Sequence, residues 1–220
     1  TSDQKRIMLE TRDEWINLFF DNVRNKRDID KPAFEEGIKW LYNDLLKKPT
    51  PKIIYCDGWL SCLLTIAILK DKNLIKKSWA PVWDSVGAPV WASIRASVWD
   101  SVGAPVGAPV GASVGDSVMA SIGDSVNEYS SYIDLSNYGW VSFYDFFEKI
   151  NLLDNFNFKQ YKKLIRSNVF NAYEYKNYVF AIQPPVYIET NLAGRLHSTT
   201  QAAVQFRDGS EYYFINGRSI

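Results

Sequence analysis

Two cysteines and the single histidine are the side chains of this sequence with the chemistry of a nucleophilic site. A thiolate can attack a carbonyl carbon when an imidazole takes up its proton, and the two groups can come from distant parts of the chain. Cys56 and Cys62, however, lie in one apolar stretch, which is typical of buried free thiols, and His197 precedes a predicted hairpin. We therefore assign no catalytic residue to them, and their number and spacing predict no metal site and no cofactor.

Asp57 is the stronger candidate for an active-site group. It follows the β-rich run Lys52–Cys56 and precedes Gly58, at the kind of strand end where α/β proteins place functional groups. One hypothesis is therefore an enzyme of unknown class in the globular part, with a site formed by Asp57, Arg195 and His197. The alternative, which we favour, is that the Asp57 carboxylate caps a helix that starts at Trp59. The turn lacks the glycine pattern that would bind a phosphate.

Residues 79–126 carry a second set of candidates, because they are twelve consecutive copies of a four-residue unit. The first position is Trp, Gly, Arg or Met, the second Ala or Asp, the third Ser or Pro, and the fourth Val or Ile. If one side of this repeat binds a partner, its aromatic and acidic residues are the candidates, namely Trp83, Trp91, Trp99, Asp84, Asp100 and Asp116. The same residues also suit packing at corners and solvation of an otherwise uncharged repeat.

The period of four predicts the shape of this repeat. It matches neither the 3.6 residues per turn of an α-helix nor the alternation of a strand, and the prolines of the GAPV and WAPV units would break a helix. A chain that turns a corner once per unit, with Val or Ile pointing into a narrow core, satisfies the pattern. WDSVGAPV recurs sixteen residues on, at Trp83 and Trp99, which favours about three four-sided coils.

The segments on either side of the repeat predict ordinary helices and strands. Helical spacing, with Ser2 and Asp30 as N-caps and Pro32 in a first turn, predicts two helices that end before Pro49. We expect a largely buried helix over 59–70, helices over 141–150 (capped by Ser142) and 158–167, and strands over 52–56, 178–183 and 186–190. Asp208-Gly209 lies between two apolar runs and predicts a hairpin of 202–206 with 211–215.

The repeat and the tail together resemble an uncharacterised bacterial protein family. Its members carry W/G-A/D-S/P-V units upstream of a tail with L-H, then G-P-A, D-G, aromatics and a closing G. The corresponding residues here are Leu196-His197, Gln201-Ala202-Ala203, Asp208-Gly209, Tyr212-Tyr213 and Asn216-Gly217, with Gln201-Ala202 in place of Gly-Pro. The run Ile53 to Asp57 is also similar to the middle of that family. The resemblance covers most of the chain and implies an architecture only, because the family has no established activity.

Charge and hydropathy exclude two classes of partner. The 25 basic and 25 acidic residues give a net charge of zero, whereas proteins that bind a nucleic-acid backbone carry a basic excess. The longest apolar run, Leu63 to Leu69, is much shorter than the ~20 residues that span a bilayer. We therefore expect no nucleic acid, no membrane span and a cytoplasmic location.

These observations combine into one expected architecture. The fold class is α+β, a mixed helical/β globular domain with an inserted tetrapeptide-repeat solenoid and a C-terminal β-hairpin. We expect a mainly helical part with one strand over 1–78, the solenoid over 79–126, and an α+β part over 127–220 that packs with 1–78. The function predicted is a non-enzymatic protein-interaction or scaffold module that uses the repeat surface. The alternative is the enzyme with a site near Asp57 and His197.

Overall fold

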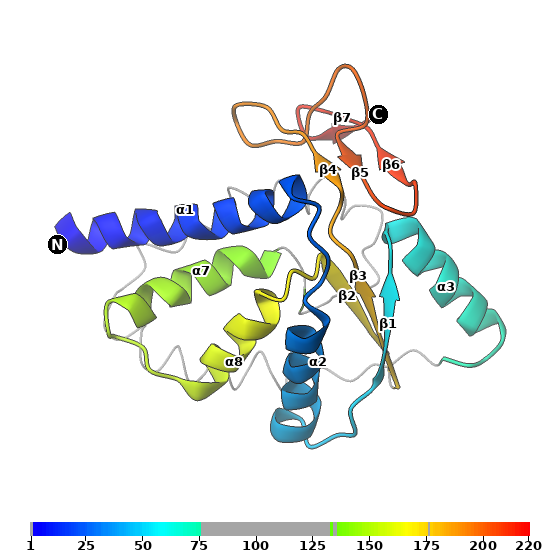
Figure 1. Cartoon of the computed structure of the whole chain (residues 1–220), viewed down its shortest axis with the longest axis horizontal. Coiled ribbons are helices and arrows are strands. Elements are labelled where there is room, and N and C mark those ends of the chain that lie inside the picture. Colours follow the sequence, from blue (N-terminus) through cyan, green and yellow to red (C-terminus); the bar gives the residue numbers. More distant parts are fainter. Residues whose placement is uncertain (1, 76–132, 134–135, 176) are drawn as a thin grey trace.

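The fold is known from a computed structural model, which describes residues 2–75, 133, 136–175 and 177–220. Figure 1 shows helices α1, α7 and α8 on one side of a central sheet, helix α3 on the other, and the C-terminal strands grouped together beyond the end of the sheet. The described chain is thus a mixture of helices and strands, which confirms the predicted α+β class. The predicted solenoid lies outside the described residues.

The N-terminal helices form where the apolar spacing predicts them. Helix α1 is Ser2–Arg24, and its buried face carries Trp15, Phe19 and Val23. Helix α2 is Lys31–Lys39, and the Asp30 carboxylate accepts a hydrogen bond from the Ala33 amide at 3.1 Å, as predicted for an N-cap. The chain then widens into a π-helical turn, η1 (Trp40–Leu45), which helical periodicity does not foresee.

A three-stranded sheet in the order β1-β3-β2 lies at the centre. Its strands are β1 (Lys52–Cys56), β2 (Asn171–Tyr175) and β3 (Tyr178–Ile182). Strand β1 runs parallel to β3, and β2 runs antiparallel to β3. Strand β2 has no counterpart in the sequence predictions, although β3 and β1 do. Helix α3 (Trp59–Asp71) follows β1 and contacts both β1 and β3.

Two further helices pack beneath α1 and α2. They are α7 (Ser136–Lys149), which packs against α1, and α8 (Phe156–Ile165), which packs against α2. Ser142 was expected to cap the first of these, but α7 begins six residues earlier, and the Ser142 hydroxyl donates to the Gly139 carbonyl inside the helix at 2.7 Å. The fully buried rings of Phe34, Phe147, Phe158 and Phe180 form the core between these layers.

The C-terminal strands are short and form two small antiparallel sheets. These are β4 (Tyr187–Ile188), β5 (Val204–Gln205) and β6 (Glu211–Tyr212) in one sheet, and β7 (Phe214–Ile215) with β8 (Arg218–Ser219) in the other. Strands β5 and β6 form the predicted hairpin, and Gly209 in its turn has a φ of +78°, a conformation that favours glycine.

Both described residues closest to the repeat are anchored in this fold. Ile75 follows α3, is 6% exposed, and its amide donates to the Leu69 carbonyl. Ile133 is fully buried, and its carbonyl accepts a hydrogen bond from the Ala172 amide of β2 at 2.9 Å. The described residues on either side of the repeat therefore lie at the end of α3 and beside strand β2.

Candidate functional site

The junction of β1 and α3 is where the parallel part of the sheet ends. The Cys56 carbonyl accepts a hydrogen bond from the Gln183 amide at 2.8 Å, so the carboxyl ends of β1 and β3 lie side by side. This is the sheet edge at which open α/β proteins bind ligands. Asp57 directly follows the last residue of β1 and therefore lies at this edge, as the sequence predicts.

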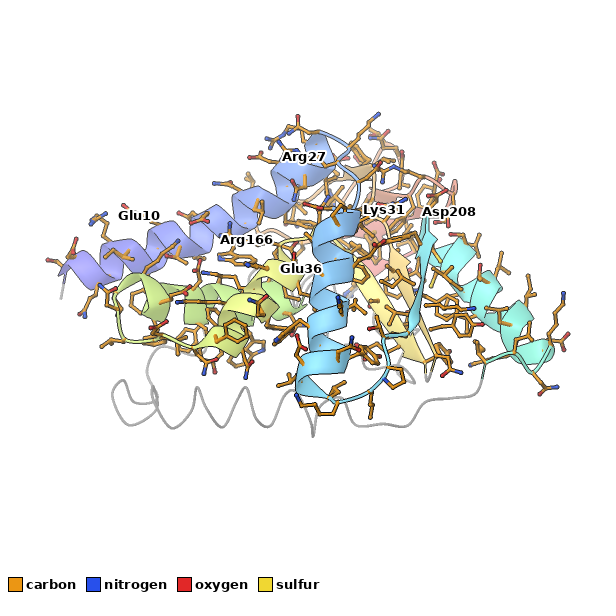
Figure 2. The ribbon with its side chains drawn as sticks, turned by 60° about the horizontal axis from the view of Figure 1, so that its bottom comes forward. Glu10, Arg27, Lys31, Glu36, Arg166 and Asp208 are labelled. Carbon is orange, nitrogen blue, oxygen red and sulfur yellow. The ribbon has the colours of Figure 1, made fainter. Side chains whose placement is uncertain are left out.

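The carboxylate that caps α3 is not Asp57 but Asp208, which lies in the turn of the C-terminal hairpin. Asp208 Oδ2 accepts the Ser61 amide of the first turn of α3 at 2.8 Å, and Oδ1 accepts the Ser210 amide and hydroxyl at 3.0 and 2.6 Å. Figure 2 shows Asp208 beside the start of α3. Burial raises the pKa of Asp208, but these hydrogen bonds outweigh burial and the pKa lies below its ordinary value. The helix terminus that could attract a ligand anion therefore holds a carboxylate of the chain itself.

This cap depends on a close approach at Gly58. A Cβ atom built on Gly58 would lie 2.3–2.4 Å from the carboxylate of Asp208, while the backbone there is extended (φ −173°, ψ −177°). Glycine is needed for space and not for backbone conformation. Arg207 holds the same turn by donating to the carbonyls of Pro184 (3.0 Å) and Lys26 (2.7 Å).

The two cysteine thiols are neighbours at this junction. Cys56 ends β1 and Cys62 lies in the first turns of α3; both are free and buried. A hydrogen bond from Cys62 lowers the pKa of Cys56, and the same contact, together with burial, raises the pKa of Cys62 far above its ordinary value. The expectation of buried free thiols is confirmed.

Arg195 and His197 lie on the connection between β4 and β5. The Arg195 amide donates to the Asn191 side chain at 3.1 Å, and His197 Nδ1 accepts the Asn216 amide, also at 3.1 Å. Across the described ranges, no hydrogen bond or ion pair links Asp57 to either residue. The binding candidates Trp83, Trp91, Trp99, Asp84, Asp100 and Asp116 lie outside the described residues.

A buried carboxylate joins helices α1, α7 and α8, which lie on the side of the sheet opposite to α3. Asp145 on α7 is 2% exposed; its Oδ2 accepts the Trp15 indole N–H at 3.0 Å and its Oδ1 accepts Lys162 Nζ at 2.8 Å. Arg166 lies over the Trp15 ring at 4.6 Å and pairs with Glu14, and it is labelled between these helices in Figure 2. Because each charge here has an opposite partner, the cluster fastens α1, α7 and α8 together.

The outward face of α3 is apolar, contrary to the prediction of a largely buried helix. Trp59, Cys62 and Ile66 pack inward, but three residues one turn apart are about half exposed: Leu60 (48%), Leu64 (54%) and Ile68 (54%). We call these three residues the α3 ridge. Beside the ridge is a cavity of about 140 Å³ lined by Leu63, Ile66, Ala67, Lys70 and Tyr173. An apolar helix is either fully buried or presents an apolar face to a partner. Because Leu60, Leu64 and Ile68 are about half exposed, α3 is not fully buried, and its outer face has the character of a contact surface.

In the described ranges, no group of three or more His, Cys, Asp or Glu side chains is arranged to hold a metal ion. None of the helices in those ranges combines the length and the apolar character that crossing a membrane requires. Comparisons of the chain with protein-family models, with curated proteins and with solved structures found no match. The candidate sites of this protein therefore depend on its own geometry.

Proposed function

We propose that this protein is a non-enzymatic protein-interaction module, in which a rigid α+β base presents the tetrapeptide repeat to a protein partner. The observation that carries the proposal is the anchoring of the chain on both sides of the repeat. Ile75 and Ile133 are both buried, and Ile133 is hydrogen-bonded to the outer edge of β2. Two fixed ends reduce the conformational entropy that a partner-binding segment loses on binding.

The polar groups of the β1–α3 junction support the same proposal. The N-terminus of α3 is capped by Asp208, and the free thiol of Cys62 donates a hydrogen bond to the thiol of Cys56. These groups are engaged in holding α3 and the C-terminal hairpin to the sheet. The enzyme alternative, built on Asp57, Arg195 and His197, lacks a comparable observation in its favour.

The experiment is a comparison of tryptophan variants. Trp83 and Trp99 are replaced together by Ala, and Trp140→Ala serves as the control, because Trp140 lies on α7 and is 44% exposed. Proteins that co-purify with the tagged chain are quantified, and circular dichroism verifies folding. We expect partners to be lost only with the repeat variant. Full retention of every partner by a folded Trp83→Ala/Trp99→Ala protein would refute the proposal.

A further inference from the structure

Strand β1 lies at one edge of the central sheet, and its hydrogen bonds go to one side. The Lys52 amide donates to the Asn177 carbonyl at 2.9 Å, and the Cys56 carbonyl accepts the Gln183 amide at 2.8 Å. In a parallel pair, a residue that donates to the neighbouring strand also accepts from it, and the next residue along directs both groups to the other side. Every second residue of β1 therefore turns its amide and carbonyl away from β3.

Ile53 and Tyr55 are these outward-facing residues. Within the described ranges, no hydrogen bond uses the backbone amide or carbonyl of either residue, and no strand pairs with this side of β1. The opposite edge of the sheet differs, since the Ala172 amide of β2 donates to the Ile133 carbonyl. Buried backbone groups are nearly always paired, so the unpaired groups of β1 indicate an edge that is open to solvent. Figure 1 shows β1 at one side of the sheet, with β3 next to it.

The centre of this edge lacks the features that keep another chain from pairing with a strand. Natural edge strands are protected by a bulge, a proline or a charged side chain. Here Pro51 and Lys52 lie at the start of β1, whereas Ile53, Ile54 and Tyr55 continue it in unbroken register with β3 and carry no charge. A strand of another chain therefore finds a regular set of backbone donors and acceptors at these residues.

The charges next to the edge define the chemistry of that strand. Lys47, Lys48 and Lys52 are exposed, and residues 45–56 contain no acid. The exposed acid Asp57 lies at the other end of β1. Opposite charges on neighbouring strands attract each other, and like charges directly opposite are destabilising. Acidic side chains are therefore favoured beside Lys52.

We infer that the outer edge of β1 binds an extended, acidic segment of a partner protein, which adds a strand to the central sheet. The backbone groups of Ile53 and Tyr55 supply the main-chain hydrogen bonds, and the lysines select the acidic partner. This surface is separate from the repeat, because β1 contains no residue of 79–126.

Amide hydrogen exchange of the full chain, resolved by NMR, tests whether the edge is open. The amides of Ile53 and Tyr55 are expected to exchange at least about tenfold faster than the Ile54 amide, which faces β3. Equal protection of all three would overturn the inference. Protection that grows with protein concentration would show a second copy on the edge and would overturn the acidic partner.

The binding probe is a short synthetic peptide in which valine and threonine alternate and two glutamates stand at one end. Two such peptides, with the glutamates at the N-terminal or the C-terminal end, cover the two strand directions. We expect one of them to bind, measured by fluorescence anisotropy, and to protect the amides of Ile53 and Tyr55. The same peptide with N-methylated amides has no strand donors and is expected not to bind. Absence of protection by either peptide, or equal binding of the methylated form, would overturn the inference.

A pair of variants at one position tests the main-chain contact. Ile53→Pro removes an outward amide but none of the bonds to β3, a substitution that edge strands accept. Ile53→Ala is the control, because it loses the same side chain and keeps the amide. The peptide dissociation constant is expected to rise roughly tenfold for Ile53→Pro and to change little for Ile53→Ala. Circular dichroism verifies folding, and the methylated peptide makes the same test if Ile53→Pro does not fold. Equal affinities of the two folded variants would contradict the inference.

A charge reversal tests the acidic chemistry. Lys52→Glu is expected to weaken binding of the glutamate peptide and to strengthen binding of a peptide with lysines in place of the glutamates. An unchanged preference would refute the acidic partner. These results are separate from the proposed function, because the Trp83→Ala/Trp99→Ala variant leaves β1 intact and should bind the peptide as the wild type does.

Discussion

The indole N–H of Trp15 donates to Oδ2 of Asp145 at 3.0 Å, across 130 residues of sequence. Asp145 also accepts Lys162 Nζ and lies 3.5 Å from Lys149 Nζ, so that one buried carboxylate connects α1, α7 and α8. Burial raises the pKa of Asp145, but the hydrogen bonds from Lys162 and Trp15 outweigh burial and the pKa lies below its ordinary value. The stabilisation by Asp145 is therefore present above the pKa of the unfolded chain and is lost as the pH falls through the lower folded value.

Replacing Asp145 by Ala is expected to lower the free energy of unfolding by roughly 3 kcal/mol, because it leaves the buried indole N–H of Trp15 without its acceptor and removes one of the two carboxylate partners of Lys162, the other being Glu148. The control is Asp154→Ala, which removes an ion pair with Lys159 from the surface and should change little. Urea unfolding at neutral pH measures both. Equal effects of the two variants would contradict the role assigned to Asp145.

Glu174 is expected to make the protein less stable as the pH rises. Burial raises the pKa of Glu174 to about 7, against an opposing hydrogen bond from Tyr42, and its Oε1 is buried and accepts no hydrogen bond within the described ranges. The folded pKa is above the unfolded one, so stability is full below the ordinary value of 4.5 and declines as the pH rises through about 7.

The difference in unfolding free energy between Glu174→Gln and the wild type should therefore change in favour of the variant as the pH rises from 5 to 8, by at most about 3 kcal/mol. Chemical denaturation at the two pH values measures the gain. Glu148→Gln is the control. Glu148 forms an ion pair with Lys162, so neutralising it should make the protein less stable. A Glu174→Gln difference that is the same at both pH values would show that the carboxyl does not titrate in this range.

The contact of Gly58 with Asp208 predicts a coupled pair of substitutions. Gly58→Ala should cost about 1–3 kcal/mol, because the new methyl group displaces the carboxylate that caps α3. In an Asp208→Ala background the same substitution should cost much less, since the obstacle is gone. A double-mutant cycle on unfolding free energies measures this coupling, and strict additivity would contradict the close approach.

Thiol titration tests the pairing of Cys56 with Cys62. The Cys62 thiol lowers the pKa of Cys56 by donating a hydrogen bond. Cys62→Ala should therefore raise the pH midpoint of Cys56 alkylation, whereas Cys62→Ser, which can still donate, should leave it nearer to the wild-type value. Mass spectrometry after alkylation at a series of pH values reports the midpoint. The same midpoint in all three proteins would mean that the thiols do not interact.

Elements with a local signal were predictable from the sequence. The Asp30 cap, the strand over 52–56 and the Asp208-Gly209 hairpin each depend on residues close in the chain, and all three are confirmed. Strand β2 was missed because its sequence, Asn171–Tyr175, lacks the alternation of a half-exposed strand and is almost entirely buried. The apolar character of α3 predicts burial, but one-dimensional periodicity does not distinguish a buried helix from one with an apolar outer face.

The candidate site was harder to predict because its decisive contacts are long-range. The position of Asp57 in the sequence predicts that it caps α3, but the capping carboxylate comes from Asp208, 147 residues beyond Ser61. The Trp15–Asp145 contact spans a similar distance. Neither pair has a spacing or a motif in the sequence that would connect its members.

The most direct test of the central proposal is affinity purification of the tagged chain beside a variant that lacks the sixteen residues Trp83 to Val98. Both are analysed by mass spectrometry for proteins and small molecules, and thermal unfolding verifies that the base stays folded. The proposal predicts a protein partner that the full chain retains and the deletion loses. A small molecule retained equally by both, with no protein dependent on the repeat, would contradict the proposal and place the function in the globular base.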